Sequence, residues 1–464
     1  MTKKKRFSVS FLKVRMILFG KGKSQSKNLF CPIKKTNLKK VKHFILSTTF
    51  LFLAVFSTAQ IPGLNYDESK VPVYTLPDPL TFNNGEKVTT VEQWEKKRRP
   101  ELLEFFSSQM YGRTPKEKIR VTYQIVSENP NFMNGKATAK QVKFIFTNDG
   151  KNVQALLLLV LPNGSKEKIP VFVSYNYGGN HSTTFDTTIV YSPSFALLRI
   201  PEQPDRERGR SVSRWPYEQI LERGYGIATM FFEEIYHDST VRLEWEEQSI
   251  AALFTGYNLS AAKAPDQWQA LGAWAWGSSR IVDYLETQEW VDMEKIIIMG
   301  HSRQGKAALW AGAQDERFKM VISNNSGSCG AALSKRAFGE DIARILRHPH
   351  WFCPAFSQYV KNEAALPFDQ HELIALIAPR YVYIASAVED YGADPKGEYL
   401  SGYHAGPVYE LYGLKGLESE VQPPLNQPVM NDIGYHIRTG GHDVTDYDWA
   451  CYMDFADKHF GKPK

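Results

Sequence analysis

The clearest signal in this chain lies at residues 295–310, which read KIIIMGHSRQGKAALW. An apolar run of strand type ends at Gly300, Ser302 follows, and residues of helical type come next. This order predicts a nucleophile elbow, in which a serine lies above the carboxyl end of a buried strand and a helix N-terminus points at it. The usual spacing is Gly-x-Ser-x-Gly, but Gln304 occupies the second glycine position and Gly305 comes one residue later. The rest of the chain must therefore support the assignment of Ser302 as a nucleophile.

Strand-like and helix-like segments alternate on both sides of this turn. Buried strands are predicted at 170–175, 225–232, 295–299, 318–323, 381–387 and 435–438, and helices at 91–111, 267–285 and 446–459. Three more segments, 120–127, 141–147 and 153–161, are predicted to be antiparallel strands at a sheet edge. Strands separated by helices indicate a mainly parallel sheet with helices on both faces. We expect one α/β domain over 60–464 with an α/β-hydrolase fold, a three-layer sandwich that an N-terminal extension and helix (60–118) wrap.

The N-terminal segment has a different composition from the rest. Its first 43 residues hold 14 Lys or Arg and no Asp or Glu, and an apolar run at 44–56 precedes Ser57-Thr58-Ala59. This pattern predicts a signal peptide with a long basic leader over 1–59. The apolar run is short for a membrane span of about 20 residues, although an uncleaved signal anchor is the alternative. We expect a secreted or periplasmic protein that has no membrane contact after cleavage.

Charge and cysteine content exclude several classes of partner. The whole chain carries a net charge of +6, but the leader holds 14 of the 56 basic residues and none of the 50 acidic ones. The mature part is therefore acidic and has no basic composition that would favour nucleic acid. Beyond the leader only Cys329, Cys353 and Cys451 remain, which allows one disulfide at most and shows no zinc-binding spacing. We expect no metal, no cofactor and a monomer.

A serine nucleophile needs a base and an orienting acid, and in hydrolases of this layout they follow in the order Ser, acid, His. His442 lies in a Gly-Gly-His-Asp loop after the last predicted strand and is the expected base. His436 lies inside that strand, where a packed histidine is the simpler interpretation. Asp390 follows the strand at 381–387 and is the best-placed acid, with Asp394 and Glu389 as rivals.

The oxyanion of an acyl-transfer intermediate needs preorganised hydrogen-bond donors. One expected donor is the backbone N–H of Arg303, and the Arg303 side chain beside the nucleophile suits an oxyanion or an acidic substrate. Another donor is expected from the loop at 176–181, where Gly178 and Gly179 allow close backbone approach, although an ordinary turn is the alternative. Lys306 lies one helical turn from Ser302 on the same face of the helix.

The segment 300–306, Gly-His-Ser-Arg-Gln-Gly-Lys, resembles the Gly-(Cys or His)-Ser-Arg-x-Gly-Lys signature of the glucuronoyl esterases. This pattern accounts for the shifted glycine and for the lysine after it. The resemblance extends over roughly 65–460 and is closest to the bacterial branch of this carbohydrate esterase family. Its other landmarks are at 67–72, 74–80, 98–101, 326–327, 330–334, 338–340, 350–352, 394–398 and 441–443.

The resemblance implies hydrolysis of an ester between (4-O-methyl-)glucuronic acid on xylan and an alcohol held to be on lignin. It implies that Ser302 is the nucleophile, that His442 is the base and that Arg303 assists the oxyanion. Three residues would hold the hydroxyls and the ring of the sugar: Lys306, Glu340 and Trp351. A cation, a carboxylate and an aromatic face suit those contacts. The expected partner is a glucuronoxylan or lignin-carbohydrate ester.

The chain departs from the family pattern in two respects, the acid and a disulfide. Many members carry the acid as Glu in a Glu-Ser-Gly motif, where this chain has Asn325, but some bacterial members use an Asp after the next strand, which Asp390 matches. Fungal members join a Cys before the serine to one after the histidine, and here those positions are His301 and Asp443. An acetyl-xylan or other carbohydrate esterase of the same fold is the alternative function, and a non-catalytic carbohydrate-binding protein is a third.

Overall fold

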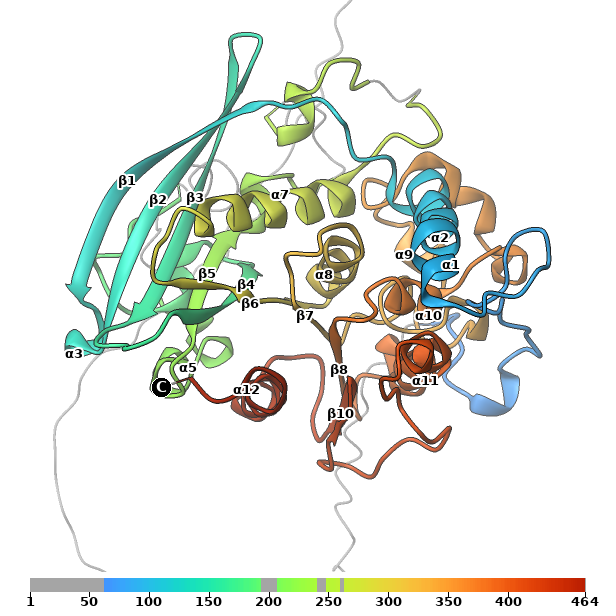
Figure 1. Ribbon diagram of the computed structural model, residues 1–464. Helices are drawn as coiled ribbons and strands as arrows, with labels where there is room; N and C mark the ends of the chain where they lie inside the picture. Colours follow the sequence, from blue (N-terminus) through green and yellow to red (C-terminus); the bar gives the residue numbers. More distant parts are fainter. Residues whose placement is uncertain (1–61, 193–206, 240–247, 259–262, 464) are drawn as a thin grey trace, which may run out of the picture. The chain divides into compact units, whose positions relative to one another are not determined.

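One ten-stranded sheet organises the computed structural model, which describes residues 62–192, 207–239, 248–258 and 263–463 (Figure 1). In spatial order the strands are β1 (Arg120–Asn131), β2 (Ala137–Asn148), β3 (Lys151–Pro162), β5 (Gly226–Phe231), β4 (Ile169–Asn176), β6 (Val291–His301), β7 (Met320–Asn324), β8 (Tyr381–Ala387), β10 (Ile433–Arg438) and β9 (Val429–Met430). The predicted signal peptide at 1–59 lies outside the described residues. The described residues belong to one compact unit, Thr58–Lys464.

The sheet is parallel at its centre and antiparallel at its edges. Pairing is parallel from β5 through β4, β6, β7 and β8 to β10. Antiparallel pairs join β1 to β2, β2 to β3 and β3 to β5, and β9 pairs antiparallel with β10. The predicted antiparallel edge is therefore confirmed. Parallel strands place their carboxyl ends at one edge, so the loops after β6, β7, β8 and β10 meet there.

Helices cover both faces of the sheet. The described α-helices are α1 (Val91–Gln93), α2 (Arg99–Phe106), α3 (Phe132–Gly135), α5 (Tyr217–Glu222), α7 (Ala270–Leu285), α8 (Arg303–Gln314), α9 (Ile342–Ile345), α10 (Gln370–Ala375), α11 (Pro395–Leu411) and α12 (Asp446–Phe460). In Figure 1, α7 and α8 lie above the central strands, and α5 and α12 lie below. The expected α/β-hydrolase architecture of three layers is confirmed.

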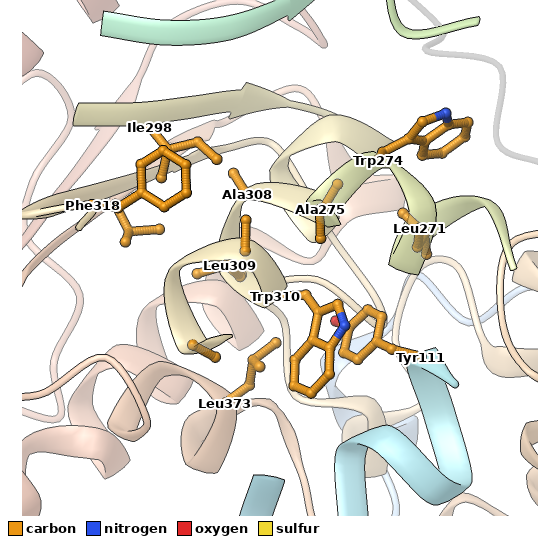
Figure 2. Packing of buried hydrophobic residues seen from close by; sticks show 14 of the residues in the cluster. Tyr111, Leu271, Trp274, Ala275, Ile298, Ala308, Leu309, Trp310, Phe318 and Leu373 are labelled. Atoms are coloured by element: carbon orange, nitrogen blue, oxygen red, sulfur yellow. The ribbon is translucent and has the colours of Figure 1, made fainter. Parts of the chain in front are cut away.

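Alternating side chains of the buried strands supply one hydrophobic core on each face. In β6, Ile296 and Ile298 join the larger core beneath α7 and α8, whereas Ile297 and Met299 join the smaller core beneath α5 and α12. Figure 2 shows α8 inside the larger core, where Trp310 stacks on Tyr111 with ring centroids 4.7 Å apart. The helix that follows the serine is thus packed on every side, which fixes the start of that helix.

The predicted N-terminal helix is present as one continuous helical segment over 91–111, with two π-helical turns (Trp94–Arg98 and Ser107–Tyr111) around α2. Thr90 caps it, because its side chain accepts a hydrogen bond from the Gln93 N–H. Gly112 ends it with φ 84°, and a Cβ there would lie 2.2 Å from Trp268 Cα. A buried ion pair between Arg98 and Glu372, 2.9 Å apart, docks this segment on α10.

Several elements differ from the sequence expectations: the short helices α5, α9 and α10 and the strand β9 were not predicted. The helix α11 carries Gly397, Gly402, Gly406 and Pro407 and was not predicted, because these residues weaken helical periodicity. The strand β6 is longer than the predicted 295–299 and begins at Val291. In the described part of the chain, every helix is too short or too polar to cross a membrane.

Candidate active site

The turn between β6 and α8 holds Ser302 in a rare backbone conformation. Its φ is 56° and its ψ is −130°, a region that non-glycine residues seldom adopt. The Ser302 N–H donates to the Asn324 carbonyl of β7 at 2.9 Å, which fixes the turn to the neighbouring strand. Strain at a single serine between a buried strand and a packed helix is the geometry of a nucleophile elbow, as the sequence predicts.

Close packing accounts for the shifted glycine. A Cβ on Gly300 would lie 2.0 Å from the Gln304 carbonyl oxygen, so this position requires glycine. A Cβ on Gly305 would lie 2.8 Å from the Ser326 Cβ and 3.0 Å from the Gly300 carbonyl oxygen. The helix therefore lies too close to its neighbours at Gly305 for a side chain, whereas the buried Gln304 side chain is accommodated one residue earlier.

The loops after β8 and β10 bring an acid and a histidine together. His442 Nδ1 lies 2.6 Å from Asp390 Oδ2, a hydrogen bond that orients the imidazole. Both residues line one cavity with Ser302. Of these described residues, Ser302 and His442 form no hydrogen bond with each other, and such bonds are often long before substrate binds. The order Ser302, Asp390, His442 is the one expected for this layout.

The rival residues have other contacts. Asp394 is buried, accepts a hydrogen bond from Arg336 Nε at 2.8 Å and caps α11 by accepting from the Gly397 N–H. Glu389 is exposed at the cavity rim. His436 is buried inside β10, where its ring nitrogens lie 3.0 Å from Asp448 Oδ1 and from Tyr383 Oη. Among the three carboxylates weighed, Asp390 is the one that contacts His442 Nδ1.

His301, the residue before the serine, supports the His442 ring. The two ring centroids are 4.5 Å apart, and His301 Nδ1 is hydrogen bonded to Asn324 Oδ1 at 2.6 Å. Burial, reinforced by the charge of His442, holds the pKa of His301 well below its ordinary value. A neutral His301 packs against His442 without repelling its protonated form. On the far side of this pair, Asp443 accepts a hydrogen bond from Arg214 Nε at 2.6 Å.

The cavity has a volume of about 410 Å³, within the range of small-ligand sites. Its lining joins the catalytic candidates to the predicted sugar-binding residues: Ser302, Arg303, Lys306, Glu340, Trp351, Asp390 and His442 all contribute. Tyr66 of the N-terminal extension also lines it. Every predicted substrate contact therefore lies around one hollow above the nucleophile.

A buried carboxylate, Asp238, links Arg303 to Trp351. Asp238 pairs with Arg303 Nη1 and accepts hydrogen bonds from Trp351 Nε1 at 2.7 Å and from His350 Nε2 at 2.8 Å. Burial opposes its ionisation, but the hydrogen bond from His350 and the charge of Arg303 together hold the pKa of Asp238 below its usual value. Among the described residues, Arg303 Nε has no hydrogen-bond partner. The guanidinium is thus fixed at one nitrogen and retains donor capacity.

Asp238 is a residue that sequence reasoning missed. It lies in the loop after β5 and the short 3-10 turn Phe232–Glu234, within Tyr236-His237-Asp238, which has no recognisable spacing. The one available signal was a cation beside the nucleophile, since a half-buried arginine usually needs a carboxylate. That reasoning predicts the kind of partner but not its position in the chain.

Lys306 and Glu340 lie on the other side of the cavity. Lys306 is buried, and its Nζ donates to the backbone carbonyls of Ser326 and Ser328. Burial lowers the pKa of Lys306 below its usual value of 10.5. Glu340 is half-buried, and its Oε1 lies 3.6 Å from Arg344 Nε. The cavity therefore presents an ammonium group and a carboxylate, which suit hydroxyl-rich ligands.

The glycines proposed for the oxyanion loop lie elsewhere. Gly178 and Gly179 are buried and are not among the residues that line the cavity. A Cβ on Gly178 would lie 2.7 Å from Ser182 Oγ, so glycine serves the packing of this turn. Tyr177 just before them supports the elbow, because its hydroxyl donates to the His301 carbonyl at 2.6 Å. Their role as oxyanion donors stays a prediction.

Neither a disulfide nor a metal-binding cluster is found in the described part of the chain. Cys329, Cys353 and Cys451 are buried free thiols. The described residues contain no group of three or more His, Cys, Asp or Glu side chains that could hold a metal ion.

The sheet order, the strained serine and the Asp390–His442 pair define an α/β hydrolase, and comparison with known proteins gives its family. The family model "Glucuronyl esterase, fungi" matches residues 226–413. Carbohydrate esterase MZ0003, from an unknown prokaryotic organism, is 42% identical over 408 residues, covering 86% of this chain and 93% of that protein. The 4-O-methyl-glucuronoyl methylesterase of Schizophyllum commune is 29% identical, covering 73% of this chain and 74% of that protein.

Solved structures agree. A promiscuous CE15 esterase from a marine bacterial metagenome superposes with a TM-score of 0.78 at 41% identity, covering 86% of this chain and all (100%) of that one. The glucuronoyl esterase from Solibacter usitatus gives a TM-score of 0.76 at 40% identity, covering 84% and 99%. The chain belongs to the glucuronoyl esterases, carbohydrate esterase family 15.

Proposed function

We propose that the protein is a secreted serine esterase that hydrolyses esters of 4-O-methyl-glucuronic acid in glucuronoxylan. The observation that carries this proposal is the 2.6 Å contact between His442 Nδ1 and Asp390 Oδ2 in one cavity with the strained Ser302. Membership of the glucuronoyl esterase family supports the reaction class, since its curated members are named 4-O-methyl-glucuronoyl methylesterases. We further propose that the chain acts as a monomer and that the leader directs it out of the cytoplasm.

The geometry supports acyl transfer in two halves. Ser302 Oγ attacks the ester carbonyl while His442 Nε2 takes the hydroxyl proton, and the imidazolium then forms beside Asp390. The carbonyl oxygen becomes an oxyanion, for which the Arg303 backbone N–H and its spare guanidinium N–H groups are donors. The C–O bond breaks as His442 returns the proton to the leaving alcohol. Water then enters and attacks the acyl carbon while His442 takes its proton. The C–Oγ bond breaks as His442 gives that proton to Ser302 Oγ, which releases the uronate and restores the serine hydroxyl.

The remaining cavity residues account for the uronate specificity we propose. Trp351 offers an aromatic face, Lys306 an ammonium group and Glu340 a carboxylate, arranged around the nucleophile. These groups match the ring and hydroxyls of a sugar better than they match a small acetyl group.

Substitution of the nucleophile tests the reaction. Ser302→Ala should lower kcat for benzyl or methyl glucuronate by at least about 10⁴-fold, because no other serine sits on the elbow. A folded S302A protein with unchanged turnover would contradict the proposal. A panel that includes acetylated xylan separates the alternative, since a preference for acetyl esters would leave Lys306, Glu340 and Trp351 without a uronate to bind.

A further inference from the structure

We propose that Asn325 is a positioning residue that holds the Asp390 carboxylate in place for His442; this inference rests on the proposed function. Asn325 follows β7, and Asp390 follows the neighbouring parallel strand β8. Asn325 Nδ2 donates to Asp390 Oδ2 at 2.8 Å. This is the same oxygen that lies 2.6 Å from His442 Nδ1. One carboxylate oxygen is thus held between two N–H donors.

The backbone of Asn325 is tied to the strand that leads to Asp390. Its N–H donates to the Ala385 carbonyl of β8 at 2.7 Å. Its φ is 45°, in the left-handed region that asparagine adopts more readily than most residues. The Asn325–Asp390 hydrogen bond therefore joins the residue after β7 to the loop after β8, and the Asn325 backbone is itself bonded to β8.

The side chain of Asn325 lies beside Asp390 in the lining of the cavity. Asn325 is 1% exposed, and among the described residues Asp390 is its one side-chain hydrogen-bond partner. Its Oδ1 is buried without a partner in the described part of the chain. Because a carboxylate can only accept, the amide nitrogen must face Asp390, which fixes the orientation of the amide. A buried amide that leaves its own oxygen unpaired indicates that the Nδ2 contact is the one that matters.

The amide donor keeps the acid in place without adding charge. Asp390 precedes the short turn Tyr391–Ala393, and its side chain is 12% exposed. The hydrogen bond from Asn325 prevents Oδ2 from rotating away from His442. A second carboxylate at this position would repel Asp390, whereas a neutral donor lets His442 face a single negative charge. Orienting hydrogen bonds of this kind typically contribute about 10- to 100-fold to activity.

A double-mutant cycle on the full-length mature protein tests the inference. Asn325→Ala should lower kcat for benzyl glucuronate by about 10- to 100-fold and leave KM within about twofold, because the amide nitrogen is bonded to the Asp390 carboxylate that orients the base. In an Asp390→Ala background the same substitution should cost less than about twofold, because Asn325 acts through Asp390. An equal loss in both backgrounds would overturn the proposal, since a merely structural residue costs the same with or without Asp390.

Two further variants keep the test decisive. Where N325A does not fold, Asn325→Gly removes the same amide at a φ that glycine tolerates, and it should give the same cycle. Asn431→Ala is the matched control, because Asn431 Nδ2 donates to the Gly416 carbonyl at 3.0 Å near the opposite end of β10. It should leave kcat unchanged. If S302A abolishes turnover but the losses from the Asn325 and Asp390 substitutions are additive, only the role of Asn325 is contradicted. If S302A leaves turnover unchanged, the proposed function itself is contradicted.

Discussion

At the scale of a single residue, Asp238 connects two residues of the cavity wall, Arg303 and Trp351. Its carboxylate pairs with Arg303, beside the nucleophile, and accepts from Trp351, on the sugar side. Arg303 also stacks over the Trp351 ring, with its guanidinium carbon 5.0 Å from the ring centroid. Loss of this carboxylate would release a cation and an aromatic ring at once, so the proposed oxyanion donor and the proposed contact for the sugar ring depend on one buried anion.

We predict that Asp238→Asn lowers kcat by about 10- to 100-fold and raises KM for glucuronate esters, because Arg303 and Trp351 both lose an anionic partner. Steady-state kinetics with benzyl glucuronate measures both constants. Asp315→Asn is the control, since Asp315 pairs with Arg317 and does not line the cavity. If Asp238→Asn changes neither kcat nor KM, Asp238 has no role in catalysis or in substrate binding.

The positions of Ser302 and His442, the proposed nucleophile and base, could be predicted from sequence because each belongs to a local pattern. Ser302 follows a buried strand, and His442 follows two glycines after the last long strand. The acid remained open among Glu389, Asp390 and Asp394, because a turn can point any of them at the histidine. Asp238 and Asn325 could not be assigned, since their contacts join different loops and depend on how neighbouring strands pair.

At the scale of elements, a buried ion pair holds the N-terminal helical segment on α10. Arg98 and Glu372 are both buried, and Arg98 also pairs with the partly exposed Glu101 at 3.2 Å, whereas Glu372 pairs with Arg98. We predict that Arg98→Ala destabilises the fold by about 3–5 kcal/mol, because it leaves an unpaired buried carboxyl. Thermal or urea unfolding measures the change.

The companion variant distinguishes the pair from simple packing. Arg98→Met combined with Glu372→Leu removes both charges and should recover most of the lost stability. Arg113→Ala is the control, because Arg113 is half-exposed, and an exposed pair contributes about 1 kcal/mol or less. If R98A and R113A cost the same, the burial argument fails.

Helix α11 illustrates what element-level reasoning omits. Its glycines and Pro407 argue against a helix, yet it extends from Pro395 to Leu411. Tertiary contacts override the propensity: a Cβ on Gly402 would meet Ile384 and Leu417 at 2.9 Å, so the small residues let the helix lie close to β8. The pattern that hides the helix from sequence reasoning is the one that allows it to pack.

For the molecule as a whole, a buried acid makes stability depend on pH. Glu398 on α11 is fully buried and is hydrogen bonded to Ser386 Oγ at 2.6 Å and to the Gly327 N–H at 2.9 Å. Burial raises the pKa of Glu398 to about 8 from the ordinary 4.5. Between these values the folded protein binds a proton that the unfolded chain has lost. The free energy of unfolding therefore falls as pH rises through this window.

We predict that Glu398→Gln weakens this dependence, because the amide stays neutral at every pH. The Tm of the wild type relative to E398Q should be highest near pH 4.5 and should fall toward pH 8. Differential scanning calorimetry at both pH values measures the difference. A Tm difference that does not change with pH would show that Glu398 is ionised throughout.

The N-terminal extension follows the predicted leader directly and also forms part of the cavity wall. The Gly339 N–H donates to the Asn65 carbonyl at 2.7 Å, and Tyr66 forms part of the cavity wall. If the leader is removed after Ala59, as the sequence predicts, the new chain end lies only a few residues before that wall. The cleavage site would then determine how many residues precede Tyr66 in the mature chain. An affinity tag in front of residue 60 would hinder large polymers more than small test esters, so a tag after α12 is the safer choice for recombinant enzyme.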